Sequence, residues 1–168
     1  FGLDKPTSKV ETGLEEETIE IKEYELKLLK ILANNARKPL TEIASKLKTS
    51  PKKIAYDIKK LKKQGVIQGS RINVNFSKID YRFYKIWFSL RNIEQKNYNK
   101  FLTFLSNHPR IIWATKLIGY YDLSVELEVQ DIQEFRKILN QIKEKFANMI
   151  KKHESLMIFE EAVLNYLP

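Results

Sequence analysis

The side chains of this sequence that are best suited to chemistry are a cluster of lysines able to bind phosphates. Six lysines lie between Lys52 and Lys63, and Asp57 is the only acid among them. A lysine that neutralises a DNA phosphate releases a counterion, so such a cluster is typical of a surface for duplex DNA. A lysine-rich surface without this role, as in many thermophilic proteins, would instead pair its lysines with acids throughout.

The formal net charge of +9 is distributed unevenly along the 168 residues. Residues 1–21 hold two basic and six acidic side chains, residues 22–71 hold 14 and four, and the remainder holds 14 and 11. The central segment therefore carries +10, which indicates a module that binds a polyanion. Residues 1–21, with Pro6 and two glycines, are predicted to be an acidic tail or linker.

The lysine cluster belongs to a predicted helix with well-marked ends. Ser50 is a favourable N-cap, and Gly65 is a favourable residue to end the helix. Ile54, Ile58 and Leu61 are spaced by four and then three residues, so they form one apolar stripe. A helix that is held by this stripe presents its lysines outward, as a major groove lined by phosphates requires.

Two further helices are predicted before this one, over residues 22–35 and 39–47. After it, residues 66–76 alternate in polarity around a Gly-Ser pair, which is typical of a β-hairpin wing. This order predicts a winged helix-turn-helix over residues 22–76 that binds duplex DNA. The residues expected to contact DNA are Ser50, Pro51, Lys52, Lys53, Tyr56, Asp57, Lys59, Lys60, Lys63 and Arg71, the last two on the phosphate backbone.

Residues 77–168 show a second pattern, in the order β-α-β-β-α-β. Alternating apolar residues predict strands over 84–90, 110–118, 123–129 and 154–164, together with two segments of helical periodicity. This is the order of a ferredoxin-like domain, in which two helices cover one face of an antiparallel sheet. The whole chain is therefore predicted to belong to the α+β class.

The other face of that sheet has no helix to cover it. Phe83, Trp87 and Trp113 fall at positions that face this side, and a large exposed apolar surface is typical of an interface. A homodimer through the sheet is the simplest arrangement, because one patch then covers its own copy.

Several classes of function are excluded by what the sequence lacks. It has no cysteine, which rules out disulfides, thiolate chemistry and cysteine zinc sites. His108 and His153 show no metal-binding spacing, and the sequence groups no general acid, base or nucleophile. No metal, cofactor or catalytic residue is therefore expected.

The sequence also predicts a soluble cytoplasmic protein. No run approaches the roughly 18 apolar residues of a membrane span, and no signal peptide opens the chain. Because the chain begins at Phe1 rather than methionine, we expect it to be either a trimmed chain or a piece of a longer polypeptide.

The pairing of such a helix-turn-helix with such a sheet domain resembles the Lrp/AsnC, or feast/famine, transcription regulators of bacteria and archaea. The likeness extends over residues 22–168. In the first domain it rests on Glu25, Leu28, Leu29, Leu32, Asn35, Arg37, Pro39, Glu42, Ile43, Ala44, Leu47, Ser50, Pro51, Ile54, Ile58, Leu61, Gly65, Val66 and Ile67. In the second, the run of residues 116–123 matches the family's glycine-x-x-aspartate turn.

This resemblance implies a sequence-specific transcriptional regulator that dimerises through its sheet domains, often assembles into tetramers or octamers, and binds an amino acid or related metabolite. The candidate effector-binding residues are Gly119, Tyr120, Tyr121 and Asp122. Backbone amides at the glycine would hold a carboxylate, the aspartate would pair with an ammonium, and the tyrosines would wall the pocket. The same four residues also fit a plain hairpin turn, in which the aspartate caps its own backbone.

Two positions depart from the family's pattern. Asp57 stands where an arginine is usual, and an aspartate can only accept a hydrogen bond, from a cytosine amine or a neighbouring lysine. Lys48 and Thr49 stand where a glycine is common, so the turn must avoid the left-handed conformation or accept strain.

Two alternative functions remain open. Because of Asp57, one is a metabolite-sensing oligomeric module with weak or lost DNA specificity. Another is an enzyme that resembles the siroheme decarboxylases, although these carry His-Asn-Tyr where this chain has Trp113, Ala114 and Thr115.

Overall fold

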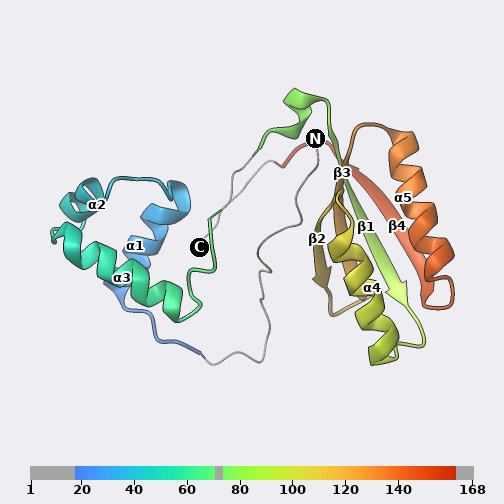
Figure 1. Cartoon of the computed structure of the whole chain (residues 1–168), viewed down its shortest axis with the longest axis horizontal. Helices are drawn as coiled ribbons and strands as arrows, with labels where there is room; N and C mark the ends of the chain where they lie inside the picture. Colours follow the sequence, from blue (N-terminus) through green and yellow to red (C-terminus); the bar gives the residue numbers. More distant parts are fainter. Residues whose placement is uncertain (1–17, 71–73, 162–168) are drawn as a thin grey trace. The chain divides into compact units, whose positions relative to one another are not determined.

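The structure is a computed structural model that describes residues 18–70 and 74–161. The described residues fall into two compact units, one on each side of residues 71–73. Figure 1 shows helices alone in the first unit and a sheet with helices in the second. Among the described helices, none is both long and apolar enough to cross a membrane.

The first unit consists of three helices, α1 (Glu23–Asn34), α2 (Leu40–Lys46) and α3 (Pro51–Lys63). They pack around Leu28, Ile43, Ala44, Ile54 and Leu61, all of which are buried. The three helices that the sequence predicts are all present, and their ends agree to within about two residues, which is the usual uncertainty of helix ends.

The ends of α3 follow from local chemistry. The Ser50 hydroxyl accepts a hydrogen bond from the Lys53 amide at 3.2 Å, which satisfies one of the free amides of the first turn. Pro51 occupies the first turn, where its missing N–H is not needed. Beyond the helix, Gly65 adopts a φ of +74°, a conformation that favours glycine.

Of the two outcomes expected where the glycine is missing, the turn before α3 shows the second, a strained left-handed backbone. Lys48 adopts a φ of +51°, in the left-handed region, even though it carries a side chain. Its neighbour Thr49 donates its amide to the Ala44 carbonyl at 2.9 Å, which ties the turn to the end of α2.

The sequence predicts a β-hairpin wing over residues 66–76. For the residues of this segment that the structure describes, the predicted strands are wrong. Residues 66–70 and 74–75 form no strand, and a short 3-10 helix, η1 (Phe76–Ile79), follows. Val66 and Ile67 pack against the helical core, and the Ile67 amide donates to the Leu61 carbonyl at 3.2 Å. The first two residues of the run that suggested a strand thus help to close the helical unit. Residues 71–73 lie outside the described residues.

The second unit is a four-stranded antiparallel sheet with two helices. Its elements are β1 (Arg82–Leu90), α4 (Gln95–Asn107), β2 (Ile111–Lys116), β3 (Leu123–Val129), α5 (Ile132–Lys145) and β4 (Ile150–Ile158). The strand order is β2-β3-β1-β4, and every neighbouring pair is antiparallel. This is the ferredoxin-like arrangement that the sequence predicts.

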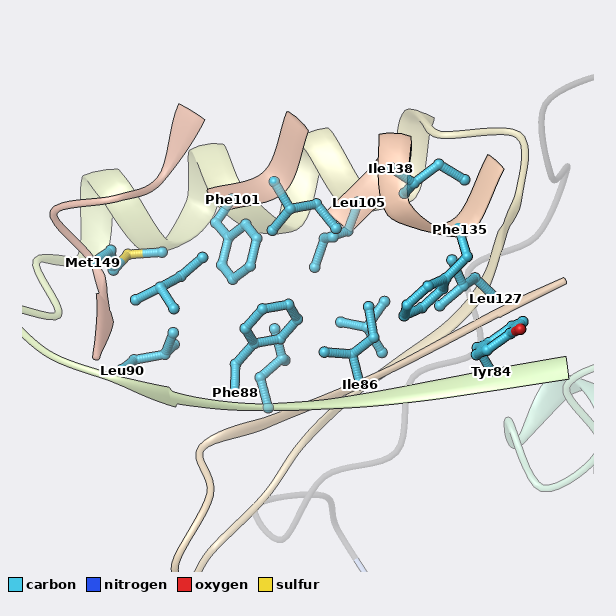
Figure 2. Packing of buried hydrophobic residues seen from close by; sticks show 14 of the residues in the cluster. Tyr84, Ile86, Phe88, Leu90, Phe101, Leu105, Leu127, Phe135, Ile138 and Met149 are labelled. Atoms are coloured by element: carbon cyan, nitrogen blue, oxygen red, sulfur yellow. The ribbon is translucent and has the colours of Figure 1, made fainter. Parts of the chain in front are cut away.

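The core of the second unit lies between one face of the sheet and the two helices (Figure 2). Tyr84, Ile86, Phe88 and Leu90 alternate along β1 and point to this core, as the sequence predicts. Phe88 meets Phe101 of α4 edge to face, with ring centroids 5.8 Å apart. We call the opposite face of the sheet, which no described helix covers, the open face.

The last strand begins and ends earlier than the sequence predicts. We expected residues 154–164, but β4 runs from Ile150 to Ile158, and residues 159–161 form no strand. Its first half reads as polar because β4 is an edge strand, on which most of these side chains remain exposed. Ile150 and His153 nevertheless pair in register with Leu90 and Phe88 of β1.

Candidate nucleic-acid interface and ligand turn

The outward side of α3 carries the predicted phosphate-binding lysines. Lys52, Lys59 and Lys63 are exposed, and the ring of Tyr56 is 68% exposed between them along the helix. On the opposite side, Ile54 and Leu61 are fully buried in the helical core. The helix is thus anchored by one side and offers cations and an aromatic ring on the other, which suits contact with a charged groove.

Two of the predicted lysines instead bind acids within the protein. Lys53 Nζ lies 2.8 Å from Asp57 Oδ2, one helical turn further along α3. Lys60 Nζ lies 2.7 Å from Glu25 Oε1, which links α3 to α1. These two lysines therefore differ from the exposed lysines of the same helix, since each already has a carboxylate partner.

The prediction that Asp57 lies on the DNA-facing side is wrong. Asp57 is only 4% exposed, so its carboxylate does not reach a base edge. The position lies between Ile54 and Leu61 on the inward stripe of α3, at the spacing of a buried residue. Lys53 makes this burial tolerable by neutralising the carboxylate from the helix surface.

The ion pairs shift the pKa of their members in the expected directions. The Lys60 hydrogen bond, followed by the Lys22 amide, holds the pKa of Glu25 below its ordinary value of 4.5. Hydrogen bonds to Asp57 and Glu25 raise the pKa of Lys53 and Lys60, respectively, above the ordinary value of 10.5. Glu25 and both lysines are therefore charged at neutral pH.

Of the remaining residues predicted to contact DNA, two are exposed at the start of α3 and one is not described by the structure. Ser50 and Pro51 lie exposed at the start of α3, where the serine hydroxyl already caps the helix. Arg71 lies outside the described residues.

The predicted effector turn, residues 119–122, joins β2 to β3 at the edge of the sheet. Asp122 fastens it to β1: Asp122 Oδ2 accepts the Leu90 amide at 2.7 Å, and the Asp122 amide donates to the Phe88 carbonyl at 2.9 Å. Gly119 has a φ of +148°, a backbone conformation that side chains rarely adopt. One carboxylate oxygen of Asp122 thus has a structural role that sequence reasoning missed.

The two tyrosines of the turn lie beside a group of aromatic and charged side chains on the open face. Tyr120 is 75% exposed, while the Tyr121 ring packs on Trp87 with centroids 5.5 Å apart. Lys152 Nζ lies 5.3 Å from the Tyr120 ring centroid and 2.8 Å from Glu154 Oε1. The Glu154 hydrogen bond raises the pKa of Lys152, while the Lys152 hydrogen bond lowers that of Glu154. The group offers a ring, a cation and an anion to a small ligand.

The open face of the sheet carries the half-buried rings of Phe83, Trp87 and Trp113, as predicted. It also holds Glu128, which is 8% exposed and lies opposite Phe83 in the pairing of β3 with β1. Burial, followed by the charge of Glu161, raises the pKa of Glu128 to about 7. The local sequence pattern does not predict the burial of Glu128.

The histidines take ordinary structural positions. His108 Nδ1 accepts the Arg110 amide at 3.2 Å in the turn between α4 and β2, and burial lowers the pKa of this imidazole. Among the described residues, no group of three or more His, Asp or Glu side chains is arranged to hold a metal ion.

Comparisons with known proteins agree with both units. Residues 21–68 match the family model described as "Winged helix-turn-helix DNA-binding", and residues 86–166 match the "Lrp/AsnC ligand binding domain". An uncharacterized HTH-type transcriptional regulator of Pyrococcus abyssi is 30% identical over 74% of this chain and 83% of its own length. The regulatory protein AsnC of Haemophilus influenzae is 23% identical over 82% and 91%.

Solved structures show the same fold. The structure of E. coli AsnC superposes with a TM-score of 0.72 at 22% identity, over 89% of this chain and 99% of that one. A transcriptional regulator of Neisseria meningitidis, solved in complex with L-methionine, superposes with a TM-score of 0.77 at 16% identity, over 89% and 97%. At these identities, the likeness shows a common architecture.

Proposed function

The chain belongs to the Lrp/AsnC family of DNA-binding transcriptional regulators, and on that premise we propose that it recognises operator DNA through α3 as a dimer or higher oligomer. The observation that carries the proposal is the division of α3 into a buried apolar side and an exposed side with Lys52, Tyr56, Lys59 and Lys63. We further propose that the protein acts in the cytoplasm and is not an enzyme.

The metabolite sensor with lost DNA specificity is not favoured as an alternative. The feature that favoured it was an acidic residue on the DNA-facing surface, and Asp57 is buried against Lys53 instead. Its charge is therefore neutralised within the helical unit and does not repel phosphates at the surface.

We expect Lys52→Ala and Lys59→Ala each to weaken binding to all duplexes alike and to lower the salt slope of log K by about one. Each substitution removes one cation that neutralises a phosphate, and neither touches the core. Fluorescence anisotropy with a labelled duplex at several salt concentrations measures the slope. Lys30→Ala, on α1, is the control and should leave it unchanged. Unchanged slopes for both α3 variants would show that DNA lies elsewhere.

We propose that two copies of the chain pair through the open face, where Phe83 and Trp87 lie half-buried. Leu156 lies on this face opposite Lys85, whereas the next residue, Met157, lies opposite Tyr84 on the helix side. We therefore expect Leu156→Lys to weaken the dimer by placing like charges in the interface, and Met157→Lys to leave it intact. Light scattering of the full-length chain measures this. Equal behaviour of the two variants would contradict an interface on the open face.

We propose that the turn of residues 119–122 binds a zwitterionic amino acid or a related metabolite. The exposed Tyr120 ring, the nearby Lys152 and Glu154 charges and the second carboxylate oxygen of Asp122 support this assignment. The Neisseria relative solved with L-methionine supports the chemical class.

A thermal-shift screen with the twenty standard amino acids tests this effector proposal. We expect a rise in melting temperature with at least one of them, because a ligand that binds only the folded state stabilises it. Tyr120→Ala should abolish the rise, whereas Tyr56→Ala, an exposed tyrosine on α3, should retain it. We avoid Asp122 as the probe because its loss would also remove the hydrogen bond to Leu90. The absence of any shift would contradict an amino-acid site.

A further inference from the structure

We propose that the two buried carboxylates of the helical unit, Glu25 and Asp57, are internal counter-ions that keep Lys60 and Lys53 off the DNA phosphates. On this view they set how many lysines of α3 take part in binding, and hence how steeply ionic strength controls it. The inference rests on the proposed function and deepens it. Glu25 and Asp57 are positioning residues, because they act on DNA only through the two lysines.

The geometry of the two ion pairs is that of fixed partners. Glu25 is 5% exposed; its Oε1 accepts from Lys60 Nζ at 2.7 Å and its Oε2 accepts from the Lys22 amide at 3.1 Å. Both carboxylate oxygens are therefore engaged, and the carboxylate cannot follow the lysine outward.

The second pair is similarly held. Asp57 Oδ2 accepts from Lys53 Nζ at 2.8 Å, and the same ammonium lies 4.8 Å from the Tyr24 ring centroid. Tyr24 is half-buried against the helical core, so a carboxylate and a ring of the same unit attract the Lys53 ammonium.

Two effects compete when DNA binds: the cost of leaving a carboxylate without its lysine and the gain from one phosphate contact. Their relative magnitudes favour keeping each lysine on its carboxylate. If Lys53 or Lys60 moved to a phosphate, a nearly buried carboxylate would lose its partner. Because the two lysine side chains are 52% and 39% exposed, this costs less than the loss of a fully buried partner, on the order of 10 to 10² in an equilibrium constant. A single phosphate contact is worth only about tenfold at moderate salt. The lysines are therefore expected to remain with their carboxylates when DNA binds.

This divides the lysines of α3 into two classes. Lys53 and Lys60 form ion pairs that count as neutral toward DNA. Within the described residues, Lys52, Lys59, Lys62 and Lys63 have no such ion pair, and only these should add to the salt slope. The cluster of six lysines between Lys52 and Lys63 therefore acts toward DNA as a cluster of four.

The sharpest test removes one pair without a change in net charge. In the full-length chain, Lys53→Gln is combined with Asp57→Asn, and the salt slope of binding to a labelled random-sequence duplex is measured by anisotropy. We expect the slope of the double variant to equal that of the wild type. Lys52→Gln, which removes the neighbouring unpaired lysine, should lower the slope by about 0.9. A comparable decrease in the double variant would show that Lys53 contacts phosphate and would overturn the inference.

A second test releases the lysines instead. Asp57→Asn and Glu25→Gln each remove a carboxylate charge and free one ammonium, so each should steepen the salt slope by about 0.9 and tighten binding at low salt by roughly tenfold. Glu23→Gln is the matched control, since Glu23 is an exposed residue of the same α1 and pairs with Lys27. An equal effect of Glu23→Gln would show that net charge alone is responsible and would overturn the inference.

These outcomes can be distinguished from failure of the proposed function. A wild-type chain that binds no duplex even at low salt contradicts the function itself. A wild-type chain that binds, with a slope that decreases in the double variant, contradicts only the counter-ion role. Circular dichroism melting of each variant identifies any that do not fold. Because the two ion pairs are tested separately, a folded variant of either pair is sufficient for a decision.

Discussion

Leu28→Ala should unfold the helical unit and abolish DNA binding while the sheet domain remains folded. Leu28 is fully buried in a small core that, among the described residues, has five buried hydrophobic side chains. Its truncation costs about 2–5 kcal/mol, which is comparable to the whole stability of a domain of this size. Thermal melting followed by circular dichroism should lose part of its helical signal at low temperature, and anisotropy should detect no binding.

Leu26→Ala is the matched control for this prediction. It makes the same chemical change on the same helix α1, but Leu26 is exposed. We expect its melting curve and its DNA affinity to stay close to those of the wild type. If Leu28→Ala bound DNA normally, the helical core would not be what holds α3 in its binding position.

Glu128→Gln should stabilise the sheet domain at pH 8 by about 2–3 kcal/mol and leave its stability nearly unchanged at pH 4. Burial raises the pKa of Glu128 from its ordinary 4.5 to about 7. The folded chain therefore favours the neutral acid. Its stability is highest below pH 4.5, decreases as pH rises toward 7, and carries the full cost of the buried charge above that.

Urea unfolding monitored by tryptophan fluorescence measures this effect in the sheet domain, because Trp87 and Trp113 are the two tryptophans of the chain. Glu126→Gln serves as the control on the same strand, since Glu126 is paired with Lys85 at 2.8 Å. The control should not gain stability at high pH. A stabilisation by Glu128→Gln that is equal at pH 4 and pH 8 would contradict a buried carboxylate with a raised pKa.

The elements that the sequence predicts well are those with local signals. Ser50 and Pro51 mark the start of α3, and strict alternation from Tyr84 to Leu90 marks β1 and its buried face. Such signals depend on neighbours in sequence, so they can be recognised before the fold is known. The family resemblance is confirmed for the same reason, since it rests on the order and spacing of such elements.

The inward position of Asp57 was available in the sequence and was overlooked. It lies three residues after Ile54 and four before Leu61, which is the spacing of a buried stripe. Its charge suggested exposure, but the acid has Lys53 as a partner one turn earlier. A charged residue on an apolar stripe, with an opposite charge four residues away, is a signal for a neutralised buried acid.

Other features depend on contacts that no local pattern reveals. Asp122 bonds to Leu90 and Glu25 to Lys60, in each case across more than thirty residues. Val66 and Ile67 begin a run that the sequence predicts to be a strand, yet tertiary packing draws them into the helical core. Such contacts become apparent only once the fold of each unit is known.

A selection of random duplexes against the full-length chain, followed by sequencing, tests most directly the claim that this protein recognises operator DNA through α3. The selection is run in parallel with a variant in which Lys52→Ala and Lys59→Ala are combined. The wild type should enrich a palindromic consensus whose half-sites are separated by about one helical turn or a multiple of it, as a symmetric dimer requires. The variant should enrich nothing at the same salt concentration. A folded wild-type chain that enriches no sequence, or a variant that enriches the same one, would contradict this account.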